Sequence, residues 1–200
     1  PVGQTCAQCI VADNRGAVAR AETRTTAIAA GKCAVPPAFG PTDPAAVNTA
    51  FARLLRLDAV FGVDLDGAVR SARTDRAGAA CQAAVVRGVV RIAGARLREF
   101  DACKAAGLKA GTIASATDLR ACLDADPRAR VTHTIALAQL AAARRCARTP
   151  VAVAFPGACA GEQLASLLGC LARRVRCDVC AALEGADGLG EVCHRVVDGV

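Results

Sequence analysis

The chain has 200 residues, of which 54% are apolar, with five Phe and no Trp, Tyr or Met. Its formal charge is +7, and most of the basic residues are arginines spread along the sequence. Nucleic-acid-binding surfaces cluster basic residues and add stacking aromatics, so the composition argues against nucleic acid and leaves loose contact with an anionic cell surface. No apolar stretch reaches the roughly 20 residues of a membrane span, so we expect no transmembrane segment.

The N-terminal part is predicted to be helical with two breaks. A helix from Cys6 to about Cys33 is interrupted near Asn14–Gly16. The segment 35–41 contains three prolines and one glycine, which break a helix, so it ends this one.

The pair Asp43 and Pro44 is typical of an N-cap followed by the first helical position. It predicts a helix that runs through Leu57 and ends or kinks at Phe61–Gly62. Asp64 and Asp66 resemble part of a calcium loop. The bidentate acid that such a loop requires does not follow, so we interpret them as a helix cap or turn.

The strongest predicted element is a long helix from about Ala77 to Ala106, which glycines at 107–111 end. Apolar residues recur along it at steps of three and four, which is typical of a packing seam: Val86, Val90, Ala93, Leu97 and Phe100. The arginines expected on the opposite, solvated face are Arg87, Arg91 and Arg98.

Two further helices are expected next. Ser115 and Asp118 have the spacing of a capping box, which predicts a short helix over 117–123. Asp126 with Pro127 repeats the cap-and-proline start of a helix that runs to about Cys146. Its inward residues are expected to be Val131, Ile135, Leu137 and Leu140.

The C-terminal part is predicted to hold a loop over 149–161, a helix over 162–183, a turn over 185–190 and a last helical turn over 191–197. Val151–Phe155 is the one stretch that resembles a strand, and no segment alternates long enough to require one. We therefore predict an all-α fold of disulfide-stapled antiparallel helical hairpins or a bundle. We divide it into an N-terminal helical region, 1–76, and a cysteine-stapled region, 77–200, which could form one continuous domain.

Twelve cysteines dominate the functional analysis. They are Cys6, Cys9, Cys33, Cys81, Cys103, Cys122, Cys146, Cys159, Cys170, Cys177, Cys180 and Cys193. A reducing cytosol rarely holds so many thiols outside metal sites. The chain begins at Pro1 and lacks methionine, which we interpret as a mature form without its signal peptide. We expect an extracellular or periplasmic protein.

One disulfide arrangement is favoured by helix geometry. Two antiparallel helices joined near Gly107–Gly111 would place Cys103 beside Cys122 and Cys81 beside Cys146. Cys81 and Cys103 differ by about 40° around an ideal helix, so they share one flank beside the seam. We predict these two nested crosslinks, and the sequence leaves the other connectivities open.

Metal binding is the alternative use of the cysteines. Cys177, Cys180, Cys193 and His194 have the residue types of a zinc site, although the segment is helical rather than a knuckle. A copper-storing bundle is a second metal hypothesis. It would stack its thiols inside the helices, whereas these cysteines gather near helix ends.

Enzymatic and haem chemistry lack their usual patterns. The sequence has two Cys-x-x-Cys pairs, Cys6 with Cys9 and Cys177 with Cys180. Covalent haem requires a His directly after such a pair, and neither pair has one. Neither pair lies in a thioredoxin-like context, so redox catalysis is not indicated. His133 lies in a polar helical turn and is interpreted as a solvated side chain. No nucleophile elbow, phosphate loop or zinc-protease motif occurs. We expect a non-enzymatic protein without a cofactor.

The C-terminal half resembles a group of uncharacterised, exported, cysteine-rich helical proteins of environmental bacteria. The segments that carry the resemblance are EFDACK at 99–104, GLKAGTI at 107–113, FPGACAG at 155–161, CDVCAAL at 177–183 and ADGL at 186–189. The resemblance covers about Cys81 to the end, and implies export and a crosslinked helical fold without a known activity. Cys193 is followed here by His194, where that group would have acidic residues.

Two functions are compatible with these observations. The first is a structural protein, a self-associating homo-oligomeric subunit of an extracellular filament, sheath or surface layer. The second is an exported helical protein that binds a metal, zinc or copper, through its cysteines or a small ligand in a core lined by Ala and Val.

Overall fold

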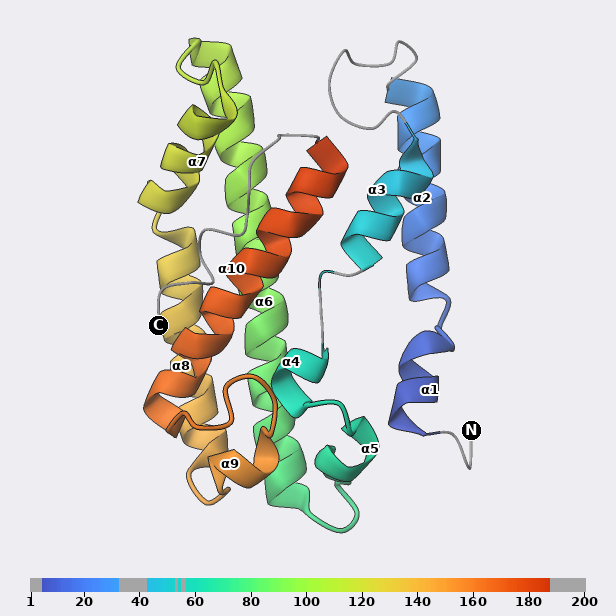
Figure 1. Ribbon diagram of the computed structural model, residues 1–200, viewed down its shortest axis with the longest axis vertical. Helices are drawn as coiled ribbons and strands as arrows, with labels where there is room; N and C mark the ends of the chain where they lie inside the picture. The colour runs from blue at the N-terminus through green and yellow to red at the C-terminus, as the bar shows by residue number, and fades with distance from the viewer. Residues whose placement is uncertain (1–4, 33–42, 53, 55–56, 188–200) are drawn as a thin grey trace.

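The computed structural model describes residues 5–32, 43–52, 54 and 57–187, and it is all-α over these residues (Figure 1). The helices are α1 (Cys6–Val11), α2 (Ala17–Lys32), α3 (Pro44–Ala52), α4 (Leu57–Phe61), α5 (Leu65–Ala68), α6 (Arg76–Ala110), α7 (Ala116–Ala125), α8 (Arg130–Cys146), α9 (Val151–Ala154) and α10 (Leu164–Asp187). Each described helix is too short or too polar to span a membrane.

Three long helices, α6, α8 and α10, form the centre of the fold (Figure 1). Helix α6 has 35 residues and is therefore about 52 Å long. One side of α10 is buried along most of its length, through Leu167, Leu168, Leu171, Ala172, Val175, Val179, Ala182 and Leu183. The core thus depends on leucine, valine and alanine, as the composition predicts.

Helices α6 and α8 approach closely because small residues lie between them. A Cβ placed on Gly88 would lie 3.0 Å from the Cβ of Ala138. Ala142 and Cys146 continue the buried side of α8. Leu137 and Leu140, which we expected to point inward, are instead 50% and 56% exposed. That prediction was wrong because the narrow gap between the helices accepts alanine but not leucine.

The predicted seam of α6 is confirmed at Ala93 and Phe100, which are buried, but it is wrong at Val90. Val90 is 46% exposed, whereas Val85, Val89 and Ile92 are buried. The buried stripe includes Cys81 and Cys103, which therefore lie within the packed face of the helix rather than beside it. The predicted solvated face is confirmed, since the three arginines at 87, 91 and 98 are all exposed.

Both ends of α6 are capped. The Asp75 side chain accepts a hydrogen bond from the Gly78 N–H over 2.8 Å. Gly111 has a φ of 68°, in the left-handed region that glycine adopts without strain. The chain then turns back, and Ile113 packs on Gly107, which has no side chain to obstruct it. Gly107 therefore belongs to α6, which ends at Ala110, four residues beyond the predicted end at Ala106.

The predicted caps of the next two helices have different outcomes. Ser115 and Asp118 form the predicted capping box of α7. Asp126 is not the N-cap of α8: it ends α7 with a φ of 42°, and α8 begins at Arg130. Its carboxylate still accepts hydrogen bonds from the N–H groups of Val131 and Thr132, so it stabilises the start of α8 from outside the helix.

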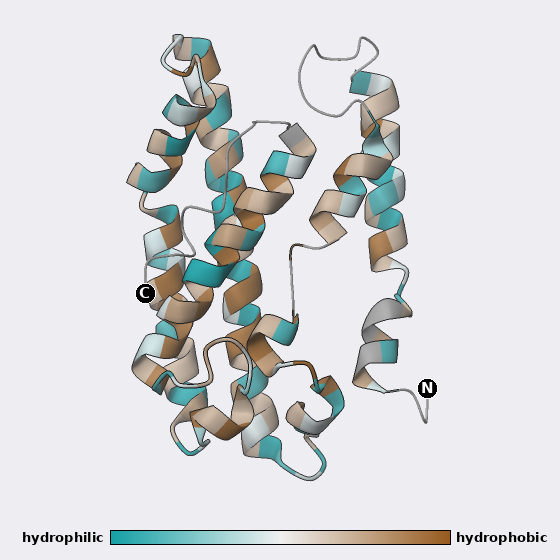
Figure 2. Cartoon of the chain, in the orientation of Figure 1, coloured by the Kyte–Doolittle hydropathy of each residue, from teal (hydrophilic) through white to brown (hydrophobic). Residues whose placement is uncertain are grey.

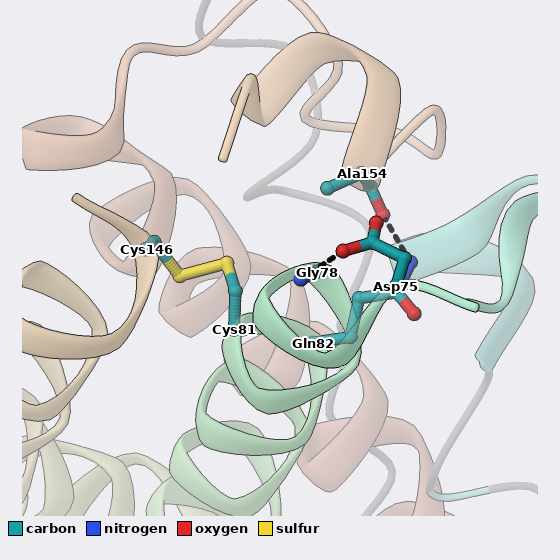
Figure 3. The surroundings of a disulfide bond; sticks show 6 residues. All are labelled: Asp75, Gly78, Cys81, Gln82, Cys146 and Ala154. Carbon is teal, nitrogen blue, oxygen red and sulfur yellow. Dashed lines mark hydrogen bonds between the residues drawn. A yellow bond between two sulfur atoms is a disulfide. The ribbon is translucent and has the colours of Figure 1, made fainter. Parts of the chain in front are cut away.

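A buried glutamine joins the short helices to α6. The Gln82 amide nitrogen donates to the carbonyl oxygens of Ala68 and Ala154, over 2.8 and 2.9 Å, and its oxygen accepts from the Arg70 N–H over 2.7 Å. Figure 3 shows the bond to Ala154 beside the Cys81–Cys146 disulfide. Ala154 ends helix α9, so the stretch that resembles a strand is helical.

The N-terminal helices show the predicted break and caps. Helices α1 and α2 are separate, and Gly16 between them has a φ of 59°. Asp43 accepts a hydrogen bond from the Ala45 N–H at the start of α3. The single predicted helix is divided in two, because α3 ends at Ala52 and α4 begins at Leu57. Helix α4 ends at Phe61, where an end or kink was predicted. Asp64 caps α5 through the Gly67 N–H, as the cap-or-turn interpretation predicts.

Contacts cross the boundary that we predicted between the two regions. Helix α3 packs against both α2 and α10, and α4 also contacts α10.

Helix α10 continues to Asp187, so the first residues of the predicted turn at 185–190 are helical, beginning with Gly185. The rest of that turn and the predicted helix over 191–197 lie outside the described residues.

Candidate functional site

Four of the twelve cysteines form the two predicted disulfides. Cys81 is bonded to Cys146, with their Cα atoms 4.6 Å apart, and Cys103 is bonded to Cys122 at 6.0 Å. A third disulfide joins Cys159 to Cys170. Disulfides of this kind are typical of proteins that fold in an oxidising environment.

The remaining cysteines differ in their state. Cys180 is disulfide-bonded. Cys6, Cys9 and Cys177 carry free thiols. Cys33 and Cys193 lie outside the described residues, as does His194.

The proposed zinc ligands are only partly described. Cys180 cannot donate a thiolate while its sulfur is in a disulfide, and Cys177 lies three residues before it on α10. Within the described segments no three His, Cys, Asp or Glu side chains gather closely enough to hold a metal ion. The geometry of these segments therefore lends no support to the zinc alternative.

The Cys6 thiol on α1 is a poor candidate for redox catalysis. Burial raises its pKa above the usual value, and the nearby Asp66 carboxylate and Cys9 raise it further. A raised pKa lowers the fraction of thiolate, which is the nucleophilic form. The Cys6 thiol therefore lacks the lowered pKa that activates a thiol for exchange.

The feature with the clearest functional geometry is a cavity of about 100 Å³ between α6, α7 and α10, which the start of α8 closes. Its apolar wall is formed by Phe100, Leu119, Leu123, Val131, Val179 and Leu183. Most of these side chains belong to the packed core, so the wall is held in place by its surroundings. We call this space the α7 cavity.

Glu99 is the most unusual residue in the wall of the α7 cavity, because its side chain is only 1% exposed. Its carboxylate lies 3.9 Å from the Arg128 guanidinium and 3.5 Å from Nε of Arg130. These ion pairs compensate its charge. Neither carboxylate oxygen has a hydrogen-bond partner, however. Buried polar atoms in native proteins usually have one.

Arg96 lines the same cavity one helical turn before Glu99. Its Nε is buried and has no hydrogen-bond acceptor. Burial lowers the pKa of Arg96, and the neighbouring Arg176 lowers it further. Arg176 itself is paired with Asp124, with 2.6 Å between nitrogen and oxygen. Three buried polar atoms without hydrogen-bond partners, the Nε of Arg96 and both carboxylate oxygens of Glu99, therefore belong to residues that line this cavity.

The wall of the α7 cavity combines apolar side chains with a few polar ones. Cys177 is a free thiol in its wall, but the described wall includes no histidine that could act as its base. The other polar residues are arginines and carboxylates. Apolar surface with a few convergent polar groups is the usual character of a small-molecule site.

Sequence reasoning missed Glu99, Arg96 and the cavity. One signal was available, because Glu99 lies in the buried stripe of α6 between Ala95 and Cys103. A charged residue on a packed face is rare unless it is paired.

The prediction for His133 is confirmed, because its side chain is exposed to solvent.

The fold and cavity define a disulfide-crosslinked helical protein with an apolar-walled cavity between α6, α7 and α10. No protein-family model matches the chain, and neither the search of curated proteins nor that of solved structures finds a match. The resemblance of the C-terminal half to exported cysteine-rich helical proteins thus stays a prediction.

Proposed function

We propose that this chain is an exported, non-enzymatic helical protein that binds a small, mostly apolar molecule in the α7 cavity. The observation that carries the proposal is the buried Glu99 carboxylate, which lines the cavity without a hydrogen-bond partner. Leaving such a group unsatisfied costs about 1–3 kcal/mol, so a ligand that supplies a donor would recover part of that cost. The disulfides support export, to an extracellular or periplasmic location.

The test is a titration with isobutanol, which matches an apolar cavity of this size. Binding is followed by NMR through the methyl groups of Leu119, Leu123 and Leu183, which line the cavity. We expect saturable shifts of these methyls. Ala116→Leu, which places a larger side chain in the cavity wall, should abolish them.

The matched control is Ala136→Leu, on the exposed side of α8. It makes the same change in volume away from the cavity, so it should leave the titration unchanged. If wild-type methyl groups do not respond to isobutanol, or if both variants respond alike, the cavity is not a binding site.

A second candidate function, self-association, is favoured by a separate observation. Helix α2 has 16 residues, yet none of its side chains is buried by the described parts of the chain. Val18 and Ile28 are about half exposed, and hydrophobic and hydrophilic residues are mixed along the helix (Figure 2). An isolated helix of this length is marginal in water, so we propose that α2 packs against a second copy of this chain in an extracellular assembly.

Sedimentation velocity tests this second proposal. We expect concentration-dependent association that the double variant Val18→Glu, Ile28→Glu removes. The matched control is Leu137→Glu, Leu140→Glu, which alters two equally exposed leucines on α8. A wild-type protein that is monomeric at all concentrations would exclude the self-associating subunit.

A further inference from the structure

Three exposed arginines of α6 form a row along one side of the helix. Arg87, Arg91 and Arg98 are separated by four and seven residues, and all three side chains are exposed. Because each residue turns an α-helix by about 100°, these side chains lie within about 40° of one another around the axis. None of them has an ion-pair partner among the residues that the structure describes.

Helix α8 runs antiparallel to α6 and lies level with this row. The Cys81–Cys146 disulfide joins the start of α6 to the end of α8. Further along, a Cβ placed on Gly88 would lie 3.0 Å from the Cβ of Ala138. Leu137, the residue before Ala138, is 50% exposed. It therefore lies at the height of the arginine row.

The arginine row and Leu137 are on the same side of the α6–α8 pair. Val89 follows Gly88, and it lines a small pocket together with Leu171 of α10. Arg87 precedes Gly88 and lies about 200° from Val89 around the helix, so it points away from α10. In an antiparallel pair, the residues that precede two facing positions lie on one side, so Leu137 points the same way as Arg87. Helix α10 packs on the other side of the pair (Figure 1).

One further arginine completes this surface. Arg144 is exposed, and it follows Leu137 by seven residues, or about two helical turns. Helix α8 contains no Asp or Glu, and α6 contains none from residue 76 to residue 98. The first exposed carboxylate of α6, that of Asp101, lies past the end of the row. We call this surface the arginine face, and its residues are Arg87, Arg91, Arg98, Leu137 and Arg144.

The chemistry of the arginine face favours an anionic lipid surface. Guanidinium groups bind phosphate oxygens through paired hydrogen bonds, and basic residues strengthen association with anionic lipids. Leucine combined with arginine is typical of helices that lie in a membrane interface. A bilayer would cover Leu137 together with the arginines, whereas a soluble polyanion would leave it in water. Single-stranded nucleic acid is disfavoured, because the face has no aromatic residue on which bases could stack.

We propose that the arginine face docks on an anionic phospholipid bilayer, with its four guanidinium groups on lipid phosphates and Leu137 among the headgroups. Helices α6 and α8 lie flat on the membrane in this arrangement, because the row from Arg87 to Arg98 extends about 16 Å along α6. None of the five residues lines the α7 cavity. The inference therefore does not depend on the proposed ligand-binding function.

Sedimentation of the protein with vesicles tests the proposal. One set of vesicles contains phosphatidylcholine with phosphatidylglycerol, and the other contains phosphatidylcholine alone. We expect roughly tenfold tighter binding to the anionic vesicles, and release in about 1 M NaCl, where charges are screened beyond about 3 Å. Equal binding to the two sets of vesicles, or no binding to either, would overturn the proposal.

Two triple variants locate the contact. Arg87→Gln, Arg91→Gln, Arg98→Gln removes three charges from the arginine face and should weaken binding to the anionic vesicles roughly tenfold. The matched control makes the same change in net charge at three exposed arginines elsewhere. It combines Arg24→Gln, Arg73→Gln and Arg174→Gln. Equal losses from the two variants would show that net charge, rather than this face, decides the binding.

A leucine substitution separates a bilayer from a soluble polyanion. Leu137→Ala should weaken binding to the anionic vesicles and leave binding to inorganic polyphosphate unchanged. Leu108→Ala alters another exposed leucine, near the end of α6, and should change neither. If polyphosphate binds as tightly as the vesicles and Leu137→Ala affects neither, the partner is a soluble polyanion and docking on a bilayer is wrong.

Discussion

Single polar residues hold separate parts of this chain together. The Gln82 side chain is buried and makes three hydrogen bonds, to Ala68, Arg70 and Ala154. It thereby connects α6 to the ends of α5 and α9. No other side-chain type offers two donors and an acceptor in this compact geometry except asparagine, which is shorter.

We expect Gln82→Leu to lower the free energy of unfolding by about 3 kcal/mol, because it leaves two carbonyl groups and one N–H without partners in the interior. Guanidinium denaturation followed by circular dichroism measures the change. Gln163→Leu alters an exposed glutamine and is the control. Equal stability of the two variants would contradict the role of Gln82.

The Asp118 carboxylate gives the protein a specific response to acid. Its pKa is lowered by the hydrogen bond from the Ser115 hydroxyl, and next by the bond from the Ala114 N–H. A group with a depressed folded-state pKa stabilises the fold above its unfolded pKa, about 3.9. That contribution is lost as the pH falls through the lower, folded value.

We therefore expect the capping box of α7 to weaken below about pH 4. An NMR titration of the Asp118 carboxyl carbon measures its pKa directly. Ser115→Ala removes the largest cause of the shift, so it should raise this pKa toward its usual value. A titration curve that Ser115→Ala does not move would show that the hydroxyl is not responsible.

At the scale of elements, close helix packing depends on particular glycines. Gly88 faces Ala138 of α8 and Leu168 of α10, at 3.0 and 3.3 Å from the position of an added Cβ. Gly94, on the same helix, would meet only the flexible end of Arg98. The two positions share a helical backbone but differ in what surrounds them.

Gly94→Ala should stabilise the protein by up to about 1 kcal/mol, because alanine favours helix over glycine. Gly88→Ala gains the same propensity but forces α8 and α10 outward, so we expect it to be about 2 kcal/mol less stable than Gly94→Ala. Thermal denaturation of the pair measures the difference. Equal melting temperatures would mean that the α6–α8 contact adapts freely.

Local signals predicted the element boundaries best. The capping box of α7 and the cap of α3 depend on residues within a few positions of each other, and both are present. Asp126 shows the limit of such signals, because an Asp-Pro pair can end one helix as well as begin another. Its left-handed backbone and its bonds to Val131 and Thr132 follow from the tight α7–α8 turn.

Packing faces were harder to predict. Val85, Val86, Val89 and Val90 all lie on α6, so apolar periodicity alone permits more than one seam. Leu137 and Leu140 are larger than the residues that the α6–α8 gap accepts. The α7 cavity could not be predicted, because its wall combines residues from α6, α7 and α10 that are far apart in the sequence.

At the scale of the whole molecule, two nested disulfides tie distant parts of the chain together. Cys81–Cys146 spans 65 residues and Cys103–Cys122 spans 19. In the loop-entropy model these bridges contribute about 4 and about 3 kcal/mol, which is comparable to the net stability of a domain. Both pairs were predicted because α6 and its partners are joined by short connections.

We expect the double variant Cys81→Ala, Cys146→Ala to lose more stability than Cys103→Ala, Cys122→Ala, because it opens the longer loop. Denaturation in guanidinium without reductant measures both. The parent protein treated with dithiothreitol should be less stable than either variant. A greater loss from the shorter loop would show that strain or packing, rather than loop entropy, decides the effect.

The two nested bridges also close the backbone into concentric covalent rings, and the connection 111–115 lies inside both of them. A protease that cleaves this connection opens the rings but releases no fragment, because the pieces stay attached at two points. A molecule cleaved there would keep α6, α7 and α8 covalently joined, so proteolysis at this connection would not separate the central helices.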